Sequence, residues 1–257
     1  MADRVIGLLH PGEMGAALAM ELRRGRLVLW ASSGRSAETA ERAEQAGLQD
    51  AGTVEELAET SDIILSVCPP HGALAVAASI ASFKGIYVDA NAISPMTARE
   101  IATVVEEGGG QFVDGGIVGP PPRAGVPTSL YLSGPMAASV ADLFRDTVVQ
   151  ARIVSDEPGS ASAMKMAYAA WTKGTAALLL AIRAVARAEG VEDTLLTEWH
   201  ESIPELPERS RRAAAAADGK GWRWVGEMEE IARTFEAAGL PGGFHEAAAE
   251  VYRRYPR

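Results

Sequence analysis

Lys165 is the residue of this sequence best placed for acid–base chemistry. It is the only charged residue between Gly159 and Thr172, in a stretch of small and apolar residues typical of a buried helix. A lysine is rarely buried without a partner, and removal from water lowers its pKa toward the range useful for proton transfer. Thr172 falls on nearly the same helical face, and Tyr168 lies one turn away. Lys165, Tyr168 and Thr172 are therefore candidate catalytic residues; the alternative is a lysine whose stem follows the helix and whose charge reaches solvent.

A glycine-rich turn near the start of the chain, GLLHPGEMG from Gly7 to Gly15, could bind a dinucleotide. Such turns commonly read Gly-x-Gly-x-x-Gly, where the second glycine lets backbone amides approach the pyrophosphate and the third lets the helix pack on the strand. Gly12 and Gly15 hold these two places, but His10 replaces the first glycine. Pro11 favours an extended conformation for His10, so we expect the turn to tolerate the substitution. The predicted cofactor-binding residues of this turn are His10, Pro11, Gly12, Glu13 and Met14, with His10 covering the edge of the cofactor.

The segment after the second predicted strand, ASSGRSAET, indicates which dinucleotide binds. An NAD-binding enzyme usually carries an acidic residue here, about 20 residues past the glycines, which holds the ribose hydroxyls. No Asp or Glu lies between Gly25 and Ala37, where Ser32, Ser33 and Arg35 line the turn instead. A guanidinium can bind a 2′-phosphate through two hydrogen bonds, so the segment favours NADP (NADPH). The alternative is a surface arginine followed by Ser36 as a helix cap.

The elements that must position these residues alternate between short β-rich runs and helical segments up to about residue 155. This pattern predicts an α/β fold, an N-terminal Rossmann doubly wound parallel sheet followed by an all-α C-terminal domain. Strands are expected at residues 4–9, 26–30, 63–68, 85–89, 111–113, 129–132 and 152–154, and helices at 14–24, 37–46, 54–59, 73–82, 95–107 and 135–144. A long helix to about Ala188 follows, then shorter helices broken at Pro204, Pro207, Gly219, Gly221 and Gly239. We expect a dinucleotide-binding domain at 1–157 and a helical substrate and dimerisation domain at 158–257.

Composition narrows the class of protein. The formal charge of −10 over 257 residues argues against a nucleic-acid partner, because phosphate binding needs basic patches. Cys68 lies in the apolar run DIILSVC and is expected to be a buried structural thiol. His71, His200 and His245 lack the spacing of metal ligands, so no metal is expected. No targeting segment is evident and no stretch approaches the roughly 20 apolar residues of a membrane span, so we expect a cytoplasmic protein without a membrane partner.

The opening segment GLLHPGEMGAALA resembles the signature of the β-hydroxyacid dehydrogenase superfamily, which includes 6-phosphogluconate and 3-hydroxyisobutyrate dehydrogenases and the related imine reductases. That signature reads Gly-x-Ile-Gly-x-Gly-x-Met-Gly, and this chain departs from it at His10. The stretch SVCPP, residues 66–70, resembles the segment that packs against the ribose and nicotinamide. DANAISP, residues 89–95, resembles an Asp-x-Asn/Ser-x-x-Pro segment near the nicotinamide. The resemblance adds to the predicted cofactor-binding residues Val67, Cys68, Pro69 and Asn91.

Two later segments resemble the substrate side of the same superfamily. DGGIVGPPPRAGVPTSLYLSG, residues 114–134, resembles the substrate-binding region, with Val118-Gly119-Pro120 in place of Ser-Gly-Gly. GSASAMKMAYAAWTKG resembles the interdomain-helix motif Gly-x-Gly-x-x-x-Lys-x-x-x-Asn, in which lysine is the general acid/base and asparagine orients the substrate. Lys165 matches, but Ala161 replaces the second glycine and Ala169 the asparagine. The substrate-binding residues so indicated are Ile117, Val118, Gly119, Pro120, Lys173 at the cleft edge and His245 before the last helix.

The resemblance implies a homodimeric NADP-dependent oxidoreductase. It would transfer hydride between the nicotinamide and a small hydroxy acid, carbonyl or imine, with Lys165 as the general acid/base. The C-terminal part is similar to that of a branch whose helical domain has no known function. Two alternatives stay open. The first is a non-catalytic NADP-binding sensor or partner protein, because Ala169 and Val118 stand where the superfamily carries polar substrate-binding residues. The second is a Rossmann methyltransferase that uses S-adenosylmethionine, which would leave Lys165 and Arg35 unexplained.

Overall fold

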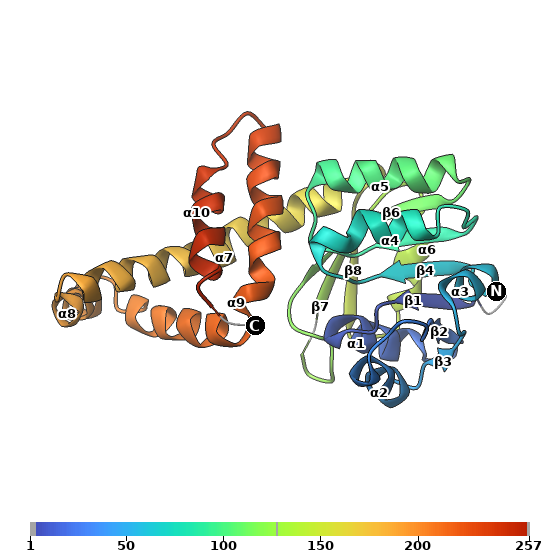
Figure 1. The fold of residues 1–257 in the computed structure, drawn as a ribbon, viewed down its shortest axis with the longest axis horizontal. Helices are drawn as coiled ribbons and strands as arrows, with labels where there is room; N and C mark the ends of the chain where they lie inside the picture. The colour runs from blue at the N-terminus through green and yellow to red at the C-terminus, as the bar shows by residue number, and fades with distance from the viewer. Residues whose placement is uncertain (1–3, 127, 256–257) are drawn as a thin grey trace. The chain divides into compact units, whose positions relative to one another are not determined.

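The computed structural model describes residues 4–126 and 128–255. Residues 1–3, Pro127 within the predicted substrate region and residues 256–257 lie outside this description. The chain divides into two compact units, one up to Lys165 and one from Met166, which are described separately below (Figure 1).

The first unit is built on an eight-stranded sheet. The strands are β1 (Ile6–Leu9), β2 (Val28–Trp30), β3 (Gln49–Asp50), β4 (Ile63–Ser66), β5 (Ile86–Asp89), β6 (Gln111–Val118), β7 (Thr128–Ser133) and β8 (Val149–Ser155). Their order is β3-β2-β1-β4-β5-β6-β7-β8, and the pairing is parallel throughout except between β6 and β7. The chain therefore winds outward from β1 in both directions, which brings the ends of β1 and β4 together at a switch point.

Helices cover both faces of this sheet (Figure 1). One face packs against α1 (Glu13–Leu22), α2 (Ala37–Gln45), α6 (Ala137–Ala141) and the 3₁₀ turn Asp142–Phe144. The other packs against α3 (Val54–Thr60), α4 (Ala73–Ser79), which follows the 3₁₀ turn Pro70–Gly72, and α5 (Pro95–Glu107). Successive strand residues alternate between the two cores, as Leu8 and Leu9 do. The predicted doubly wound α/β fold is confirmed.

Some strands differ from the sequence-based expectation. β3 is absent from that expectation, because it is two exposed residues long and carries no apolar run. β6 continues from the predicted residues 111–113 to Val118 through two glycines, which are poor strand formers but are buried here. β8 is also longer than predicted, since its exposed positions give no apolar alternation.

The second unit is helical. α7 (Ser160–Ala188) begins in the first unit and continues into the second, where α8 (Glu192–Ser202), α9 (Leu206–Ala237) and α10 (Gly243–Tyr252) follow. The predicted breaks before Pro204 and at Gly239 are confirmed. Those at Pro207, Gly219 and Gly221 are wrong, because α9 runs through all three.

The reasons for the uninterrupted α9 are local. Pro207 occupies the first turn, where no backbone N–H is needed. Gly221 serves packing, since a Cβ added there would lie 3.1 Å from the Tyr255 Cβ. Nothing lies within 4 Å of a Cβ at Gly219, so that residue costs the helix only about 1 kcal/mol of intrinsic propensity. Within the alanine run of α9, Ala213 and Ala217 are buried, whereas Ala215 and Ala216 are exposed.

α7 is long and apolar enough, by length and composition alone, to cross a membrane, which the expectation from the sequence overlooked. Core helices of globular units meet the same test. In the second unit α7 packs on other helices: the Tyr252 hydroxyl donates to the Lys173 carbonyl oxygen at 2.7 Å, and Arg183 pairs with Glu192 at 2.6 Å.

Candidate functional site

The turn after β1 is tighter than predicted. His10 has a φ of 65°, so the expected extended conformation is wrong, and it is the only non-glycine with positive φ in the described part of the chain. The Gly12 amide donates to the His10 carbonyl oxygen at 2.7 Å and closes a turn around Pro11. That closure overrides the usual preference before proline, and histidine is among the residues that tolerate the left-handed region. The positive φ at His10 also explains why related turns carry a glycine at this place, because glycine adopts a positive φ without strain.

The two remaining glycines of the turn have different surroundings. A Cβ on Gly15 would lie 3.0 Å from the His10 carbonyl oxygen and 3.4 Å from the Val67 Cβ, so Gly15 allows α1 to approach the ends of β1 and β4. A Cβ on Gly12 would meet nothing within 4 Å. Gly12 is also the N-cap of α1 and supplies no side-chain hydrogen bond to the first amides of this helix. An uncapped helix N-terminus beside an open glycine fits a dinucleotide pyrophosphate.

Two polar side chains border this turn. His10 is partly buried, and burial together with the nearby Arg35 guanidinium lowers its pKa to about 4, so its imidazole is neutral near pH 7. His10 Nδ1 and Arg35 Nε are buried without a hydrogen-bond partner among the described residues. Unsatisfied buried donors and acceptors are rare, and at a predicted cofactor site they fit groups that a ligand would complete.

Sequence reasoning missed an acidic residue beside this region. Asp50 ends β3, and its Oδ1 accepts from the Gly52 amide at 2.8 Å. That bond and a hydrogen bond with Ser32 lower the Asp50 pKa. Ser33 donates its amide to the Gly52 carbonyl oxygen at 2.9 Å, and Ser36 caps α2 as the alternative interpretation expected. The Asp50 carboxylate therefore lies beside the predicted 2′-phosphate segment, which carries Arg35. Because Asp50 belongs to β3, only a prediction of that strand would have placed it there.

A buried polar network lies at the ends of β4 and β5. The Asn91 side-chain amide donates to Asp89 Oδ2 at 2.8 Å and to Ser66 Oγ at 3.2 Å, and its Oδ1 accepts from the Cys68 amide at 2.5 Å. Burial raises the pKa of Asp89 to about 7 although the Asn91 bonds oppose that rise. Burial and the Asp89 charge raise the pKa of Cys68 to about 12, so its thiol is not a nucleophile near pH 7. The network fixes the backbone of the predicted cofactor segment at residues 66–70.

A second buried carboxylate anchors the first turn of α7. Asp114 on β6 accepts from the Ser162 hydroxyl at 2.6 Å, from the Ser162 amide at 2.9 Å and from Ser133 Oγ at 3.0 Å. Ser133 Oγ in turn accepts from the Ala161 amide at 3.0 Å. Carboxylate and hydroxyl groups from the sheet thus satisfy the amides of a helix N-terminus. Gly159, with a φ of 93°, makes the turn into this helix.

The anchored turn places Lys165 over β6. A Cβ on Gly116 would lie 2.9 Å from the Lys165 Cβ and 2.8 Å from the Ala161 carbonyl oxygen, so only glycine lets α7 lie this close. Asp114 pairs in register with Asp89, the last residue of β5, and Gly116 is two residues further along. Lys165 is therefore at the carboxyl edge of the sheet, the edge that also carries the glycine turn.

The other predicted residues of the first unit lie at its loops. Glu13 and Pro69 are exposed, whereas Met14 and Val67 pack against the core below α1. Ile117 is buried at the end of β6, Val118 is partly buried, and Gly119 and Pro120 are exposed. The Thr128 hydroxyl donates to the Pro120 carbonyl oxygen and closes this loop. The cofactor and substrate roles given to these residues stay predictions.

The predicted residues of the second unit differ in exposure. Tyr168 is 48% exposed, and the Thr172 hydroxyl donates to its carbonyl oxygen at 3.3 Å. The Lys173 ammonium binds Glu227 Oε1 at 2.8 Å. His245 is buried, packs on Phe235 with ring centroids 4.4 Å apart and faces Gly174. Burial lowers its pKa.

Comparisons with known proteins agree with this geometry. A family model described as the NAD binding domain of 6-phosphogluconate dehydrogenase matches residues 5–145, more than half of the chain. The chain belongs to this family. Residues 186–255 of this 6-phosphogluconate dehydrogenase-like chain match a second family model, a domain of unknown function (DUF1932). The family membership identifies the first unit as the nucleotide-binding unit of an NAD(P)-dependent oxidoreductase.

Individual relatives cover most of the chain. An uncharacterised 28.5 kDa protein of Methanothermus fervidus is 32% identical over 192 residues, 74% of each chain. A solved protein of unknown function, described as structurally similar to 3-hydroxyacid dehydrogenases, is 28% identical with a TM-score of 0.72 over 97% of this chain and 96% of its own. A reductive aminase from Aspergillus terreus, solved with NADPH, shares the fold: 20% identity and a TM-score of 0.63 over 98% of this chain and 93% of its own.

Asp89 and Asp114 are buried carboxylates of this 6-phosphogluconate dehydrogenase-like unit to which sequence reasoning gave no role of their own. Both end a Val-Asp pair, in IYVD and in FVD, and both are fully buried. The repeated Val-Asp at neighbouring strands is the signal that could have found them, because it puts two carboxylates side by side at one sheet edge. Among the described residues, no three His, Cys, Asp or Glu residues are grouped to hold a metal.

Proposed function

We propose that this 6-phosphogluconate dehydrogenase-like chain is an NADP-dependent oxidoreductase that transfers hydride between the nicotinamide and a small hydroxy acid, carbonyl or imine. The position of Lys165 carries the proposal. Asp114 anchors its helix, and the absence of a side chain at Gly116 lets the Lys165 Cβ approach the sheet at the edge of the glycine turn. A lysine held at that edge is well placed to act on a substrate beside the nicotinamide.

The residues that would hold the cofactor follow from the turn. Amides of the first turn of α1, beside Gly12, suit the pyrophosphate, and the neutral His10 imidazole suits an uncharged edge of the cofactor. Cys68 follows β4 and Asn91 follows β5; the Asn91 side chain joins them and is held by Asp89, at the sheet edge where the nicotinamide side is expected. The bound cofactor supplies the hydride, and the protein supplies alignment and the proton. In reduction Lys165 Nζ donates a proton to the substrate oxygen or nitrogen as its carbon gains hydride; in oxidation it accepts one.

Arg35 supports a preference for NADP. Its Nε is buried without a partner in the described structure, and Ser32 and Ser33 flank it. A 2′-phosphate would accept hydrogen bonds from all three. Asp50 opposes this preference, because its carboxylate hydrogen-bonds Ser32 and would instead favour a ribose hydroxyl. The NADPH bound to the Aspergillus terreus reductive aminase supports the phosphate-bearing cofactor.

The substrate side supports a pocket different from that of a carboxylate-binding dehydrogenase. Val118-Gly119-Pro120 replaces the polar Ser-Gly-Gly expected from the superfamily, and Ala169 replaces the asparagine one turn after Lys165. Ile117 at the end of β6 adds a buried apolar side chain. These replacements favour a carbonyl or imine, and we assign Tyr168 and Thr172, one and two turns after Lys165 on α7, as polar groups that assist Lys165.

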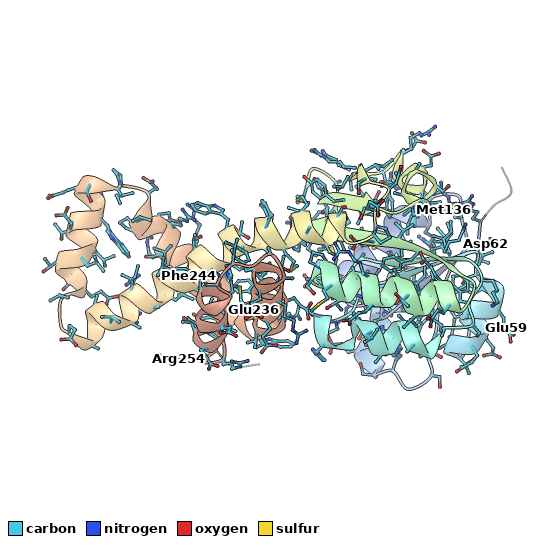
Figure 2. All side chains as sticks on the ribbon, turned by 90° about the horizontal axis from the view of Figure 1, so that it is seen from above. Glu59, Asp62, Met136, Glu236, Phe244 and Arg254 are labelled. Carbon is cyan, nitrogen blue, oxygen red and sulfur yellow. The ribbon has the colours of Figure 1, made fainter. Side chains whose placement is uncertain are left out.

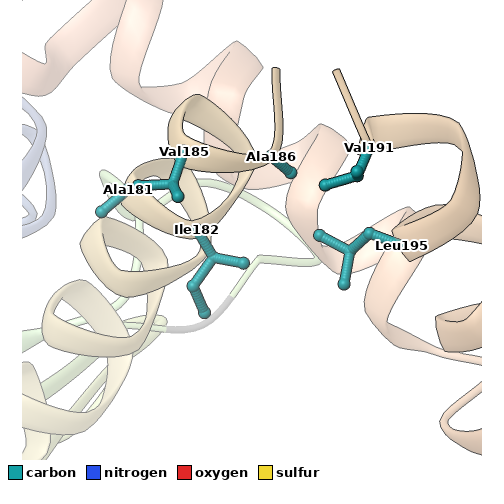
Figure 3. A pocket seen from close by; sticks show the side chains of 6 residues that line it. All are labelled: Ala181, Ile182, Val185, Ala186, Val191 and Leu195. Atoms are coloured by element: carbon teal, nitrogen blue, oxygen red, sulfur yellow. The ribbon is translucent and has the colours of Figure 1, made fainter. Parts of the chain in front are cut away.

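We also propose that the enzyme is a cytoplasmic homodimer whose helical domain, residues 158–257, provides substrate and subunit contacts. Apolar side chains of α7 and α8 line a cavity of about 390 Å³ (Figure 3), formed by Ala181, Ile182, Val185, Ala186, Val191 and Leu195. Val185 is 63% exposed, and Phe244 at the start of α10 is 82% exposed (Figure 2). Contact with a second copy would remove this apolar surface from water.

Thermal unfolding with added cofactors tests the proposal first. A ligand that binds only the native state raises the melting temperature with concentration over Kd. We expect a larger rise with NADPH than with NADH, and no rise with S-adenosylmethionine. Oxidation of NADPH in the presence of ketones or imines then tests turnover. If neither nicotinamide cofactor raises the melting temperature, the proposal is wrong.

The second candidate function is a non-catalytic NADP sensor, which the replacement of asparagine by Ala169 favours. NADPH binding without hydride transfer to any member of a ketone, hydroxy acid and imine panel would support it. Turnover that disappears in Lys165→Met would exclude it.

A further inference from the structure

The second unit contains a cavity of about 360 Å³ between α7 and α9, whose lining includes the predicted site residues Thr172 and Lys173 together with arginines of α9 that the proposed hydride transfer does not use. Its walls come from one face of each helix, because most of the lining residues recur at intervals of three or four positions along the helix. α7 contributes Thr172, Lys173, Ala176 and Leu179, and α9 contributes Arg209, Arg212, Ala213, Ala216 and Trp224.

The ionisable side chains that line this cavity are all positively charged. Its ionisable lining residues are Lys173, Arg209 and Arg212, with no carboxylate among the described lining residues, although the chain carries a formal charge of −10. Two of the three cations have acidic partners outside the lining: Lys173 binds Glu227 at 2.8 Å, and Arg212 lies 3.4 Å from Glu208.

Arg209 is held differently. Its guanidinium donates to Thr175 Oγ1 at 2.7 Å and stacks over the Trp171 ring at 5.2 Å, and no described carboxylate lies within salt-bridge distance of it. An aromatic ring and a hydroxyl orient the guanidinium without neutralising it. Such a preoriented charge is suited to bind the oxygens of a carboxylate or phosphate.

The rest of the lining is apolar. Leu179, Ala213 and Trp224 offer a surface for a hydrocarbon or aromatic group next to the arginines. Small-molecule sites commonly combine an apolar wall with a few convergent polar groups. We propose that this cavity binds a small organic anion, with its carboxylate or phosphate on Arg209 and Arg212 and its apolar body against Trp224. The proposal goes beyond the oxidoreductase function and does not depend on it.

Isothermal titration with phenyl phosphate, benzoate, inorganic phosphate and benzamide tests the site. Saturating NADPH is present throughout, so that phosphate binding at the glycine turn and beside Arg35 is not measured. We expect phenyl phosphate to bind roughly tenfold more tightly than inorganic phosphate, because the ring adds contact with Trp224. Benzoate reports whether a carboxylate serves as well as a phosphate, and benzamide, which lacks the charge, should not bind.

Variants in one short arginine-rich segment locate the site. Arg209→Gln and Arg212→Gln should each weaken phenyl phosphate binding about tenfold or more. Arg211→Gln is the matched control, because Arg211 does not line the cavity and should leave binding unchanged. Arg212 is largely exposed, so its variant should keep the wild-type melting temperature even if Arg209→Gln is less stable.

Three outcomes would overturn the proposal. They are the absence of saturable phenyl phosphate binding in the millimolar range, equal binding of benzamide, and equal weakening by Arg211→Gln. None of them bears on NADPH binding or hydride transfer, so failure of this site and failure of the proposed function remain distinguishable.

Discussion

The two lysines of α7 show how differently one helix can use the same side chain. Lys165 belongs to the first unit, where buried hydroxyl and carboxylate groups anchor the helix and Gly116 admits the lysine to the sheet edge. Lys173 belongs to the second unit, where it binds Glu227 at 2.8 Å and lies 6.0 Å from the Trp224 ring centroid. Eight residues apart, the two share residue type and element.

The difference teaches that spacing along a helix does not assign a role; the surrounding groups do. Lys173 is 18% exposed and its carboxylate partner 8%, an arrangement that stabilises packing. Lys165 stands where buried polar groups fix the backbone of the helix. Lys173 is suited to holding α7 on α9, and Lys165 is suited to proton transfer.

Of the substitutions that test this comparison, Lys165→Met is expected to have the largest effect. We expect turnover to fall by about 10²–10⁴-fold, because a positioned general acid/base contributes that much to the rate. The melting temperature and its rise with NADPH should stay close to wild type. Steady-state NADPH oxidation gives the rate, and thermal unfolding gives the control. A variant that keeps at least half of the wild-type turnover would show that Lys165 is not the acid/base.

Lys173→Met should instead reduce stability. The substitution leaves the buried Glu227 carboxylate without its lysine, and we expect a loss of about 2–4 kcal/mol in the free energy of unfolding. Urea denaturation measures this loss. The matched variant Glu227→Gln removes the charge but keeps a hydrogen-bond acceptor, and should cost less. Equal stability of Lys173→Met and wild type would contradict the structural role.

Asp114→Ala tests what holds Lys165 in place. The carboxylate accepts two hydrogen bonds from Ser162 and one from Ser133, and its loss leaves buried donors unsatisfied. We expect a loss of about 2–3 kcal/mol in unfolding free energy. Turnover should fall as well, and hydrogen exchange at the Ala161 and Ser162 amides should accelerate. Protection of these amides equal to wild type would show that the anchor is dispensable.

Sequence reasoning finds the elements whose signals are local. The helix at residues 95–107 is predicted to its ends, because Ser94 caps it and Pro95 begins it. What depends on distant contacts escapes prediction: the two-residue β3, which exists only by pairing with β2, and the continuity of α9 through Gly221, which depends on Tyr255. The expectation for His10 fails for a local reason, because the preference for an extended conformation before proline loses to the turn that Gly12 closes.

The comparison between the units extends to arginines. Arg183 of the second unit is paired with Glu192 at 2.6 Å, whereas Arg35 of the first keeps a buried Nε without a described partner. Arg35→Ala should therefore weaken NADPH binding by about 10–100-fold and leave NADH binding nearly unchanged. Asp50→Asn should shift preference the other way, further toward NADPH. Fluorescence titration with both cofactors measures the ratio. Equal weakening of NADPH and NADH in Arg35→Ala would show that the guanidinium does not read the 2′-phosphate.

Substitution of Asp89 is expected to have the smallest effect on stability, and it tests the buried network directly. Its pKa rises from 3.8 to about 7 in the folded protein because burial disfavours the carboxylate. A carboxyl group with a raised folded pKa contributes stability that is full below pH 4 and is lost as the pH rises from about 4 to about 7. In Asp89→Asn that contribution to the pH dependence should disappear, so the variant should lose less stability than wild type between pH 4 and pH 7.

Urea denaturation of wild type and Asp89→Asn at several pH values measures the two slopes. The Asn91 backbone and side-chain amides each donate to one Asp89 oxygen, so the substitution keeps the size of the side chain but only one of these two acceptors. The slope of stability with pH therefore reports the charge, whereas the absolute stability also reports the lost hydrogen bond. Parallel pH profiles would contradict the raised pKa. In that case Asp89 is ionised across the whole range, and the bonds from Asn91 stabilise its carboxylate more than burial disfavours it.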